Sequence, residues 1–206
     1  RASVERTAAD LATILRRLDG APASVLGYSL GARIALALAV DHPEVVRRLV
    51  LESPSAGIVE AADREARREA DARLAADLEA GGVEAFVDGW ERQSVFASHG
   101  GLRPRVAARL RAERLANRPA GLATSLRGAG QGSMAPLHDR LAGIHAPTLV
   151  IAGALDPAGR ERAELVAAGI PGSRLALVAS AGHTPHLETP TTFRSLALEA
   201  LLEDAA

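Results

Sequence analysis

A serine in a glycine-flanked turn is the residue of this 206-residue chain whose setting most clearly indicates chemistry. The segment Gly27-Tyr28-Ser29-Leu30-Gly31 has the pattern G-x-S-x-G and lies between a predicted strand and a predicted helix. In that context the pattern forms a sharp, strained turn that raises the serine hydroxyl above a sheet, and we expect both flanking glycines to be needed there. The backbone N–H of Leu30, at the helix N-terminus, should face a developing oxyanion. A glycine-rich turn with an incidental serine is the alternative, and the flanking elements argue against it.

The serine needs two partners, because a hydroxyl is a weak nucleophile and a weak base unless a histidine accepts its proton and a carboxylate orients that histidine. Candidates follow in the order acid, then histidine: Asp156 comes after one predicted strand and His183 after the next. Both lie just beyond the carboxyl ends of strands, where open α/β sheets place their sites. Each could be an ordinary loop residue, but the three in this order predict a catalytic triad of Ser29, Asp156 and His183.

Two further polar residues near His183 permit another interpretation. His186 and Glu188 complete a His-x-x-His-x-Glu sequence, a spacing that could bind a metal. We do not favour a metal site, because the triad already uses His183 and no other ligands cluster elsewhere in the sequence. We therefore expect neither a metal nor a cofactor. The histidines expected to be structural or solvated are His42, His99, His138 and His145.

The serine turn belongs to a predicted strand–helix–strand unit. Apolar residues recur at helical spacing from Val4 to Leu18, and the apolar runs Ser24–Gly27 and Val46–Leu51 are typical of buried strands. Between these strands, Leu30–Val40 is predicted to be a helix. Such units build parallel sheets, so residues 1–57 are assigned to the first part of an α/β core.

The pattern changes between residues 58 and 141, where Ala, Arg, Glu and Leu dominate and strand signals are missing. We interpret this stretch as an inserted helical cap of about four helices separated by glycine-rich breaks, with its many charges on a solvated face. The predicted helices are Ala61–Leu78, Val83–Arg92, Pro104–Leu115 and Ala120–Arg127.

The α/β pattern returns in residues 142–206, the second part of the core, which carries the acid and the histidine. Its predicted elements are a strand at Pro147–Ala152, a helix at Gly159–Ala168, a strand at Arg174–Val178 and a helix at Pro190–Leu202. The predicted fold class is therefore α/β, with a parallel sheet and an inserted helical cap.

Composition excludes several classes of function. The chain has no cysteine, 24 basic and 25 acidic residues, and every basic residue is arginine, so thiolate and lysine Schiff-base chemistry are excluded. Near-zero net charge and 2 % aromatic residues argue against a nucleic-acid partner. The longest apolar run, Ile34–Val40, is too short for a membrane span, which needs about 18 residues. Because residues 1–10 lack a signal-peptide pattern, we expect a cytoplasmic protein.

Several segments together resemble one family of the α/β-hydrolase superfamily, the 2-succinyl-6-hydroxy-2,4-cyclohexadiene-1-carboxylate synthases of menaquinone biosynthesis (the MenH family). The segments that carry the resemblance are 27–36, 49–53, 64–75, 117–131 and 182–188, with Trp90 and Phe96. The resemblance covers nearly the whole chain and implies a lyase. Such an enzyme eliminates pyruvate from 2-succinyl-5-enolpyruvoyl-6-hydroxy-3-cyclohexene-1-carboxylate, with Ser29 as the base that His183 and Asp156 activate, and without metal or cofactor.

The resemblance also implies which residues bind a substrate with several carboxylates. Arg33 follows Ser29 by one helical turn, so the two share a face, and guanidinium groups bind carboxylates through paired hydrogen bonds. An ion pair between Arg33 and a surface acid is the alternative. Arg67 matches a substrate-binding arginine of the family, with Arg64, one turn away, as the second choice. The aromatic residues implied to line the pocket are Tyr28, Trp90 and Phe96, although core packing would also explain the last two.

The chain departs from the family at its N-terminal side. Family members begin with strands and a His-Gly loop that supplies a second oxyanion donor, and no such segment precedes the first predicted helix. We therefore expect the sequence to be the later part of a longer protein whose absent strands leave one edge of the sheet exposed. Loss of one oxyanion donor costs about 10²–10³ in rate in serine hydrolases.

Two other functions remain open at the level of sequence. A carboxylesterase or a carbon–carbon bond hydrolase of the same fold would use the same triad in a less cationic pocket. A non-catalytic ligand-binding protein would keep the fold, and its function would survive the substitution Ser29→Ala. The partner expected under the favoured interpretation is a small polycarboxylate substrate.

Overall fold

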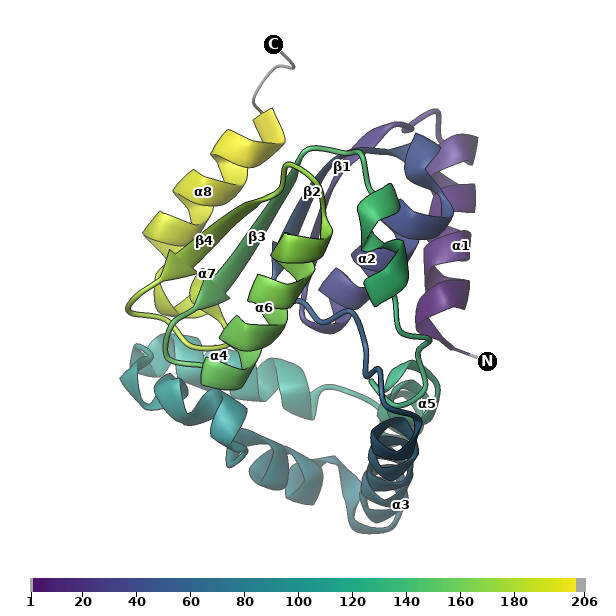
Figure 1. Ribbon diagram of the computed structural model, residues 1–206. Helices are drawn as coiled ribbons and strands as arrows, with labels where there is room; N and C mark the ends of the chain where they lie inside the picture. Colours follow the sequence, from purple (N-terminus) through teal and green to yellow (C-terminus); the bar gives the residue numbers. More distant parts are fainter. Residues whose placement is uncertain (1, 203–206) are drawn as a thin grey trace.

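The computed structural model describes residues 2–202 and contains a four-stranded, fully parallel sheet in the order β1-β2-β3-β4 (Figure 1). The strands are β1 (Ala23–Tyr28), β2 (Val46–Glu52), β3 (Thr148–Gly153) and β4 (Arg174–Val178). The buried centres of the two middle strands, residues 49–51 and 149–152, are apolar without interruption, because helices cover both of their faces. All four predicted strands are confirmed to within one residue at either end.

Alternating side chains of the sheet pack against different helices. Leu49 and Leu51 point to the face that α2 (Leu30–Asp41) and α6 (Pro157–Gly169) cover, whereas Val50 points to the face beneath α8 (Pro190–Leu202). An outer helix, α1 (Val4–Arg17), packs on α2. This three-layer arrangement confirms the predicted α/β class.

Three α-helices and one 3₁₀ segment form a helical layer beyond the carboxyl ends of the strands (Figure 1). They are α3 (Ala61–Glu91), the 3₁₀ segment η2 (Ser94–Gly101), α4 (Pro104–Leu115) and α5 (Pro119–Ala129). The two helices predicted at Ala61–Leu78 and Val83–Arg92 are halves of α3, which bends at Gly82, where φ is 81°. Glycine adopts this left-handed conformation without a steric penalty, so the expected break is a kink.

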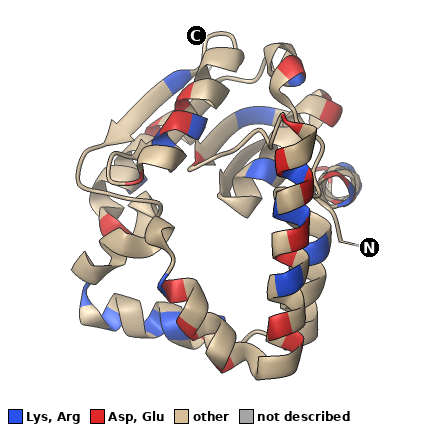
Figure 2. Ribbon diagram, turned by 60° about the horizontal axis from the view of Figure 1, so that its bottom comes forward, with Lys and Arg blue, Asp and Glu red and all other residues tan. Residues whose placement is uncertain are grey.

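Most charges of α3 are solvated, as its composition predicted, and Asp71 is the buried exception. Figure 2 shows acidic and basic residues alternating along this helix. Pairs four residues apart form exposed ion pairs, such as Arg73 with Glu69 at 3.5 Å. The opposite side of α3 packs on α5 through Ala75, Leu78 and Ala123. The helical layer therefore has a small apolar core of its own.

The segment after α5 returns to the main core before residue 142. Met134, Leu137 and Leu141 pack in the cluster that contains Leu36 of α2, and the 3₁₀ segment η3 (His138–Gly143) contacts α6. The last residues assigned to the inserted cap thus contribute to the α/β core.

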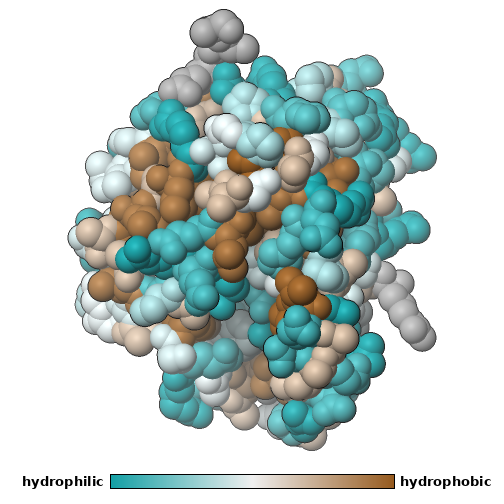
Figure 3. Space-filling view, in the orientation of Figure 1, coloured by the Kyte–Doolittle hydropathy of each residue, from teal (hydrophilic) through white to brown (hydrophobic). Residues whose placement is uncertain are grey.

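Both outer strands of the sheet leave apolar side chains exposed. Among residues 2–202, β1 pairs with a strand on one side only, and Leu26 of this strand is exposed. At the opposite edge, Figure 3 shows apolar side chains gathered over β4 and α8, where Leu175, Leu177 and Leu198 are exposed. None of the helices in residues 2–202 combines the length and apolar character required to cross a membrane.

Candidate active site

Ser29 occupies a strained turn between β1 and α2, with φ 49° and ψ −106°. Such a conformation costs a non-glycine residue about 1–3 kcal/mol and is found preferentially at functional sites. A side chain at Gly27 would place its Cβ 2.4 Å from the carbonyl oxygen of Gly31, so only glycine fits there. The expectation that Gly31 is equally restricted is wrong, because a Cβ at Gly31 would meet no atom within 4 Å outside its own helix and its chain neighbours.

A continuous hydrogen-bonded chain links the three predicted catalytic residues. The Oγ of Ser29 lies 3.1 Å from Nε2 of His183, and Nδ1 of His183 lies 2.8 Å from Oδ2 of Asp156. An ionised carboxylate only accepts hydrogen bonds, so Nδ1 of His183 carries a proton and Nε2 is left to accept the proton of Ser29. This is the arrangement needed to activate a serine hydroxyl.

The acid is held in place by the helix that it caps. Asp156 is 7 % exposed, and its Oδ1 accepts the N–H of Gly159 at 2.9 Å in the first turn of α6. Burial alone would raise the pKa of the Asp156 carboxyl, but the hydrogen bonds from His183 and Gly159 outweigh it and hold the pKa below its usual range. The carboxylate therefore stays charged and keeps the His183 ring oriented.

The loop that carries His183 is fastened by a second carboxylate. Glu188 accepts hydrogen bonds from the N–H of Gly182 at 2.8 Å, the N–H of Thr184 at 3.0 Å and the hydroxyl of Thr184 at 2.8 Å. Burial works to raise the pKa of Glu188, and these hydrogen bonds lower it further than burial raises it. Its carboxylate thus joins the residues on both sides of His183. Glu188 is the last residue of a short helix, α7 (Pro185–Glu188), that no sequence pattern predicted.

The His-x-x-His-x-Glu sequence is used within this loop. The ring of His186 turns to the buried Glu52 at 2.8 Å, and Glu188 binds main-chain N–H groups. Within residues 2–202, no three histidine or acidic side chains are grouped so as to hold a metal. Of the other histidines, His99 is half-buried in η2 and bonds Thr184 at 2.8 Å, which ties the helical layer to the loop.

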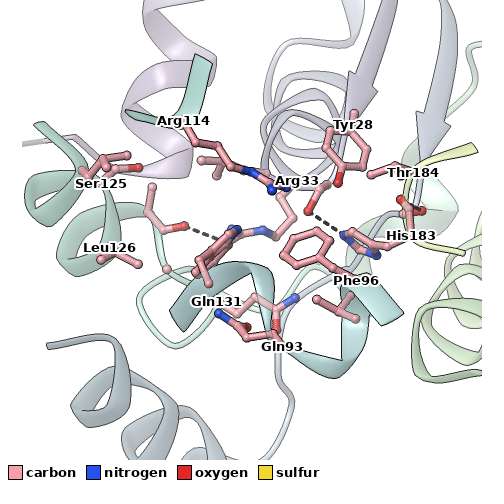
Figure 4. A pocket seen from close by; sticks show the side chains of 18 of the residues that line it. Tyr28, Arg33, Gln93, Phe96, Arg114, Ser125, Leu126, Gln131, His183 and Thr184 are labelled. Carbon is pink, nitrogen blue, oxygen red and sulfur yellow. Dashed lines mark hydrogen bonds between the residues drawn. The ribbon is translucent and has the colours of Figure 1, made fainter. Parts of the chain in front are cut away.

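Ser29 lines a cavity of about 570 Å³ between the sheet and the helical layer. Figure 4 shows this cavity, with His183 and Arg33 among its labelled lining residues. Its lining is strongly cationic: of the described residues around it, four are arginines and one, Asp71, is acidic. Those arginines are Arg33, Arg67, Arg114 and Arg162. A cavity of this character suits a ligand with several carboxylates. Leu30, the first residue of α2, also lines it, so its backbone N–H belongs to the helix N-terminus beside Ser29.

Arg33 reaches the cavity from α2 and is 8 % exposed. Its Nη1 donates to the carbonyl oxygen of Ala129 at 2.8 Å, so the alternative of an ion pair with a surface acid does not describe it. Burial, assisted by the nearby charge of Arg67, lowers the pKa of Arg33 to about 10. The guanidinium remains protonated at neutral pH, and it can therefore attract an anion into the cavity.

Of the two candidate arginines on α3, the structure directs Arg67 into the cavity. Its Nε donates to Oδ1 of Asp71 at 2.9 Å, and its Nη1 lies 3.3 Å from Oε1 of Gln131. Arg64 instead donates to the carbonyl oxygens of Ile58 (3.0 Å) and Val59 and is absent from the described lining.

The three implied aromatic residues all line the cavity. Phe96 meets the ring of His183 edge-on with ring centroids 6.1 Å apart, and the ring centroids of Trp90 and Phe96 are 6.0 Å apart. Tyr28 meets His183 edge-on at 5.6 Å, and burial, reinforced by the negative charge of Glu52, raises the pKa of Tyr28. Phe96 and Trp90 thus cover the triad from the helical layer, whereas Tyr28 contacts it from β1 and stays neutral, because burial raises its pKa.

Several lining residues escaped the sequence analysis, and Arg114 is the most prominent. Its guanidinium lies 5.1 Å from the centroid of the Phe96 ring, and its Nη1 donates to Glu91 at 2.9 Å. In a chain with 24 arginines, no local pattern distinguishes this position from its solvated neighbours. The other polar lining residues missed are Ser53, Ser55, Asp71, Gln93, Asn117, Ser125, Gln131, Arg162 and Thr184.

Comparison with known proteins agrees with this geometry. The family model described as alpha/beta hydrolase fold matches residues 2–190. A Bacillus subtilis (strain 168) protein that provisionally carries the name 2-succinyl-6-hydroxy-2,4-cyclohexadiene-1-carboxylate synthase is 38 % identical over 201 residues, which are 98 % of this chain and 73 % of that protein. The synthase of that name from Klebsiella pneumoniae subsp. pneumoniae is 30 % identical over 81 % of this chain and 63 % of its own length. This chain thus spans about two thirds to three quarters of these relatives.

Solved structures give the same result. MenH from S. aureus superposes with a TM-score of 0.93 at 34 % identity, covering 97 % of this chain and 75 % of that one. A hydrolase from Pseudomonas aeruginosa PA01 gives a TM-score of 0.77 at 30 % identity, covering 98 % and 72 %. The chain therefore belongs to the α/β hydrolase fold family and, within it, to the family of the 2-succinyl-6-hydroxy-2,4-cyclohexadiene-1-carboxylate synthases.

Proposed function

We propose that this protein is a lyase of menaquinone biosynthesis that eliminates pyruvate from 2-succinyl-5-enolpyruvoyl-6-hydroxy-3-cyclohexene-1-carboxylate. The observation that carries the proposal is the hydrogen-bonded chain of Ser29, His183 and Asp156 at a cavity with four arginines. The synthase names of the relatives support the same reaction.

The elimination needs a base, and the triad can supply it without an acyl-enzyme. Ser29 Oγ takes a proton from a ring carbon while its own proton passes to Nε2 of His183, 3.1 Å away. The electron pair of the broken C–H bond forms a ring double bond, and the bond between the ring and the enolpyruvyl oxygen breaks. The departing pyruvate enolate then takes the proton that His183 holds. Asp156 stabilises the intermediate imidazolium, and all three residues return to their starting state.

The arginines provide the binding energy for a substrate with three carboxylates. Arg33 and Arg67 lie together at one part of the cavity, since the charge of Arg67 is felt at Arg33. Arg114 extends from α4 over Phe96, next to the triad. We assign Arg33, Arg67 and Arg114 to substrate carboxylates, with Tyr28, Trp90 and Phe96 packing against the ring. The backbone N–H of Leu30 would stabilise negative charge on a substrate oxygen near Ser29.

Pyruvate release from the enolpyruvoyl substrate, followed with lactate dehydrogenase and NADH, tests the proposal beside hydrolysis of p-nitrophenyl esters. We expect pyruvate release to exceed ester hydrolysis, and Ser29→Ala to lower kcat for pyruvate by about 10²–10⁴, the usual contribution of a general base. Efficient ester hydrolysis without pyruvate release would favour the carboxylesterase or carbon–carbon hydrolase. Full function of Ser29→Ala would favour a non-catalytic binding protein.

We also propose a cytoplasmic location for this activity. A substrate with three carboxylates does not cross a lipid bilayer unaided, because moving ionised groups into hydrocarbon is costly. The enzyme must therefore meet its substrate in the compartment where that substrate is made. Fractionation of cells carrying a tagged protein checks this expectation.

A further inference from the structure

We propose that Glu52 and His186 form a positioning pair that holds the Ser29 turn and the His183 loop in register. The inference rests on the proposed role of Ser29 and His183 as the reacting pair. It concerns residues that are not assigned to substrate binding: Glu52 is absent from the described lining of the cavity, and His186, which belongs to that lining, turns its Nδ1 to Glu52. His186 belongs to the His-x-x-His-x-Glu sequence, whose second half the proposed reaction leaves unused.

Two neighbouring residues at the carboxyl end of β2 bond to both reacting elements. Glu52 is paired with Tyr28 in the sheet, and its carbonyl oxygen accepts the N–H of Ser29 at 2.9 Å. The next residue, Ser53, donates its hydroxyl to the carbonyl oxygen of His183 at 2.9 Å. The last residue of β2 and the residue that follows it thus contact the serine turn on one side and the histidine loop on the other.

The carboxylate of Glu52 makes a second connection to the same loop. Glu52 is 1 % exposed, and its Oε1 accepts the main-chain N–H of His186 at 2.9 Å and the ring Nδ1–H of His186 at 2.8 Å. Burial of a carboxylate is costly unless hydrogen bonds compensate it, so these two bonds are strongly favoured. They fix both the backbone and the ring of His186, three residues after His183.

Tyr28 transmits this constraint to the reacting atoms. Its ring meets His186 edge-on at 4.8 Å and His183 edge-on at 5.6 Å, so it is wedged between the two histidines. Figure 4 shows Tyr28 and His183 on the same side of the cavity. Tyr28 directly precedes Ser29, and a loosened His186 would free Tyr28 to move. The distance of 3.1 Å between Ser29 Oγ and His183 Nε2 thus depends on the packing of Tyr28 against the two histidines.

The discriminating comparison is between two substitutions of His186. In His186→Asn the side-chain amide can take the place of Nδ1–H as donor to Glu52, whereas His186→Leu has no donor. The readout is the rate at which a fluorophosphonate probe labels Ser29. In that reaction the Oγ–P bond forms, the P–F bond breaks with release of fluoride, and His183 takes the hydroxyl proton. No substrate is needed, so the result does not depend on which reaction the protein catalyses.

We expect His186→Leu to slow labelling by about 10- to 100-fold, because misplacement of a reacting group by 1 Å costs rates of this order. His186→Asn should stay within about threefold of the wild type, since it keeps the charge-assisted bond. In the pyruvate assay, kcat should fall with the labelling rate while KM stays nearly constant. His42→Leu, at a surface histidine near Arg16, is the matched control and should change nothing.

In His186→Leu the buried carboxylate of Glu52 keeps only the bond from the main-chain N–H of residue 186, and the loss of the ring donor can destabilise the protein. The double variant Glu52→Leu/His186→Leu removes the buried charge together with the ring that pairs with it, and such a replacement of both side chains by apolar groups is often neutral for stability. In this variant the main-chain N–H of residue 186 loses its acceptor. A folded double variant should label as slowly as His186→Leu. Wild-type labelling by the double variant, equal impairment of His186→Asn and His186→Leu, or an effect confined to KM would each overturn the proposal. If the unmodified protein reacts with the probe but releases no pyruvate, the proposed function is refuted and the positioning role is not.

Discussion

The guanidinium of Arg114 lies 5.1 Å from the centroid of the Phe96 ring, and it is held there by Glu91. Phe96 in turn meets the ring of His183 edge-on. An arginine of the helical layer is thus connected to the triad by a single aromatic side chain. This relationship brings a positive charge of α4 close to the reacting atoms, although the two segments are far apart in the sequence.

Replacement of Arg114 by lysine should weaken substrate binding. Lysine keeps the charge but loses the planar fork and the stacking on Phe96, so the exchange is not conservative at such a site. We expect KM to rise by about tenfold, equivalent to about 1.4 kcal/mol, with a smaller effect on kcat. Steady-state kinetics of pyruvate release measure this. The exposed Arg109, paired with Glu113 on the same helix, gives the control substitution Arg109→Lys, which should behave as wild type. An unchanged KM in Arg114→Lys would remove Arg114 from the substrate site.

Replacement of Asp156 by asparagine should abolish most activity while the fold persists. The asparagine amide would donate to Nδ1 of His183, and the ring would then carry its proton on Nε2, where it cannot accept the proton of Ser29. The corresponding change in serine proteases costs about 10⁴ in kcat. Single-turnover pyruvate release and the labelling rate of Ser29 should fall together. Activity within tenfold of the wild type would assign the acid role to another residue.

Glu188→Gln should lower stability and activity together. The N–H of Gly182 donates to one carboxylate oxygen and the N–H of Thr184 to the other; glutamine replaces one of these oxygens by an NH₂ group, so one of the two donors loses its acceptor. A buried donor left without an acceptor costs about 1–3 kcal/mol, so we expect a loss of that size in urea unfolding. A matched surface change, Glu164→Gln, removes only an exposed ion pair with Arg160 and should cost little. Equal stability of both variants would contradict the role of Glu188 in the loop.

The lowered pKa values of two carboxylates, Glu188 and Asp156, lead to a prediction of how stability depends on pH. The pKa values of Glu188 and Asp156 are lowered in the folded protein, so unfolding takes up protons under acidic conditions. The stabilisation from each group is complete above its unfolded pKa, about 4 for both, and is lost as pH falls through the lower folded value. Thermal unfolding between pH 7 and pH 3 should show a steep loss of stability in the wild type. Glu188→Gln should show a shallower loss, and parallel curves would refute this assignment.

The two glycines that flank Ser29 should respond differently to alanine. Gly27→Ala would force a Cβ to within 2.4 Å of a carbonyl oxygen, and overpacking of this kind costs about 1–3 kcal/mol or more. Gly31→Ala meets open space in the first turn of α2 and should be neutral or stabilising by up to about 1 kcal/mol. Unfolding midpoints of the two variants provide the test. Similar losses at both positions would mean that the turn requires glycine twice.

The local elements and the order of the site residues were predictable because short-range rules determine them. Apolar runs indicated all four strands, and helical spacing with glycine breaks indicated the helices. The elements α4, β4 and α8 have the predicted bounds. The kink at Gly82 was expected as a break, since glycine alone readily adopts its φ of 81°. Because all strands are parallel, residues that follow their carboxyl ends meet at one edge of the sheet. That rule placed Ser29, Asp156 and His183 together.

Tertiary structure alone decided which polar side chains enter the cavity and which partners they have. Arg64 and Arg67 occupy neighbouring turns of one helix, and only packing against the rest of the chain turns Arg67 inward. The bond between His186 and Glu52 joins residues 134 positions apart, and no periodicity links them. Helical and strand patterns describe which face of an element is apolar, but they contain no information on distant contacts. The sequence by itself therefore predicted the groups that we propose to react, and the folded structure determined what surrounds and holds them.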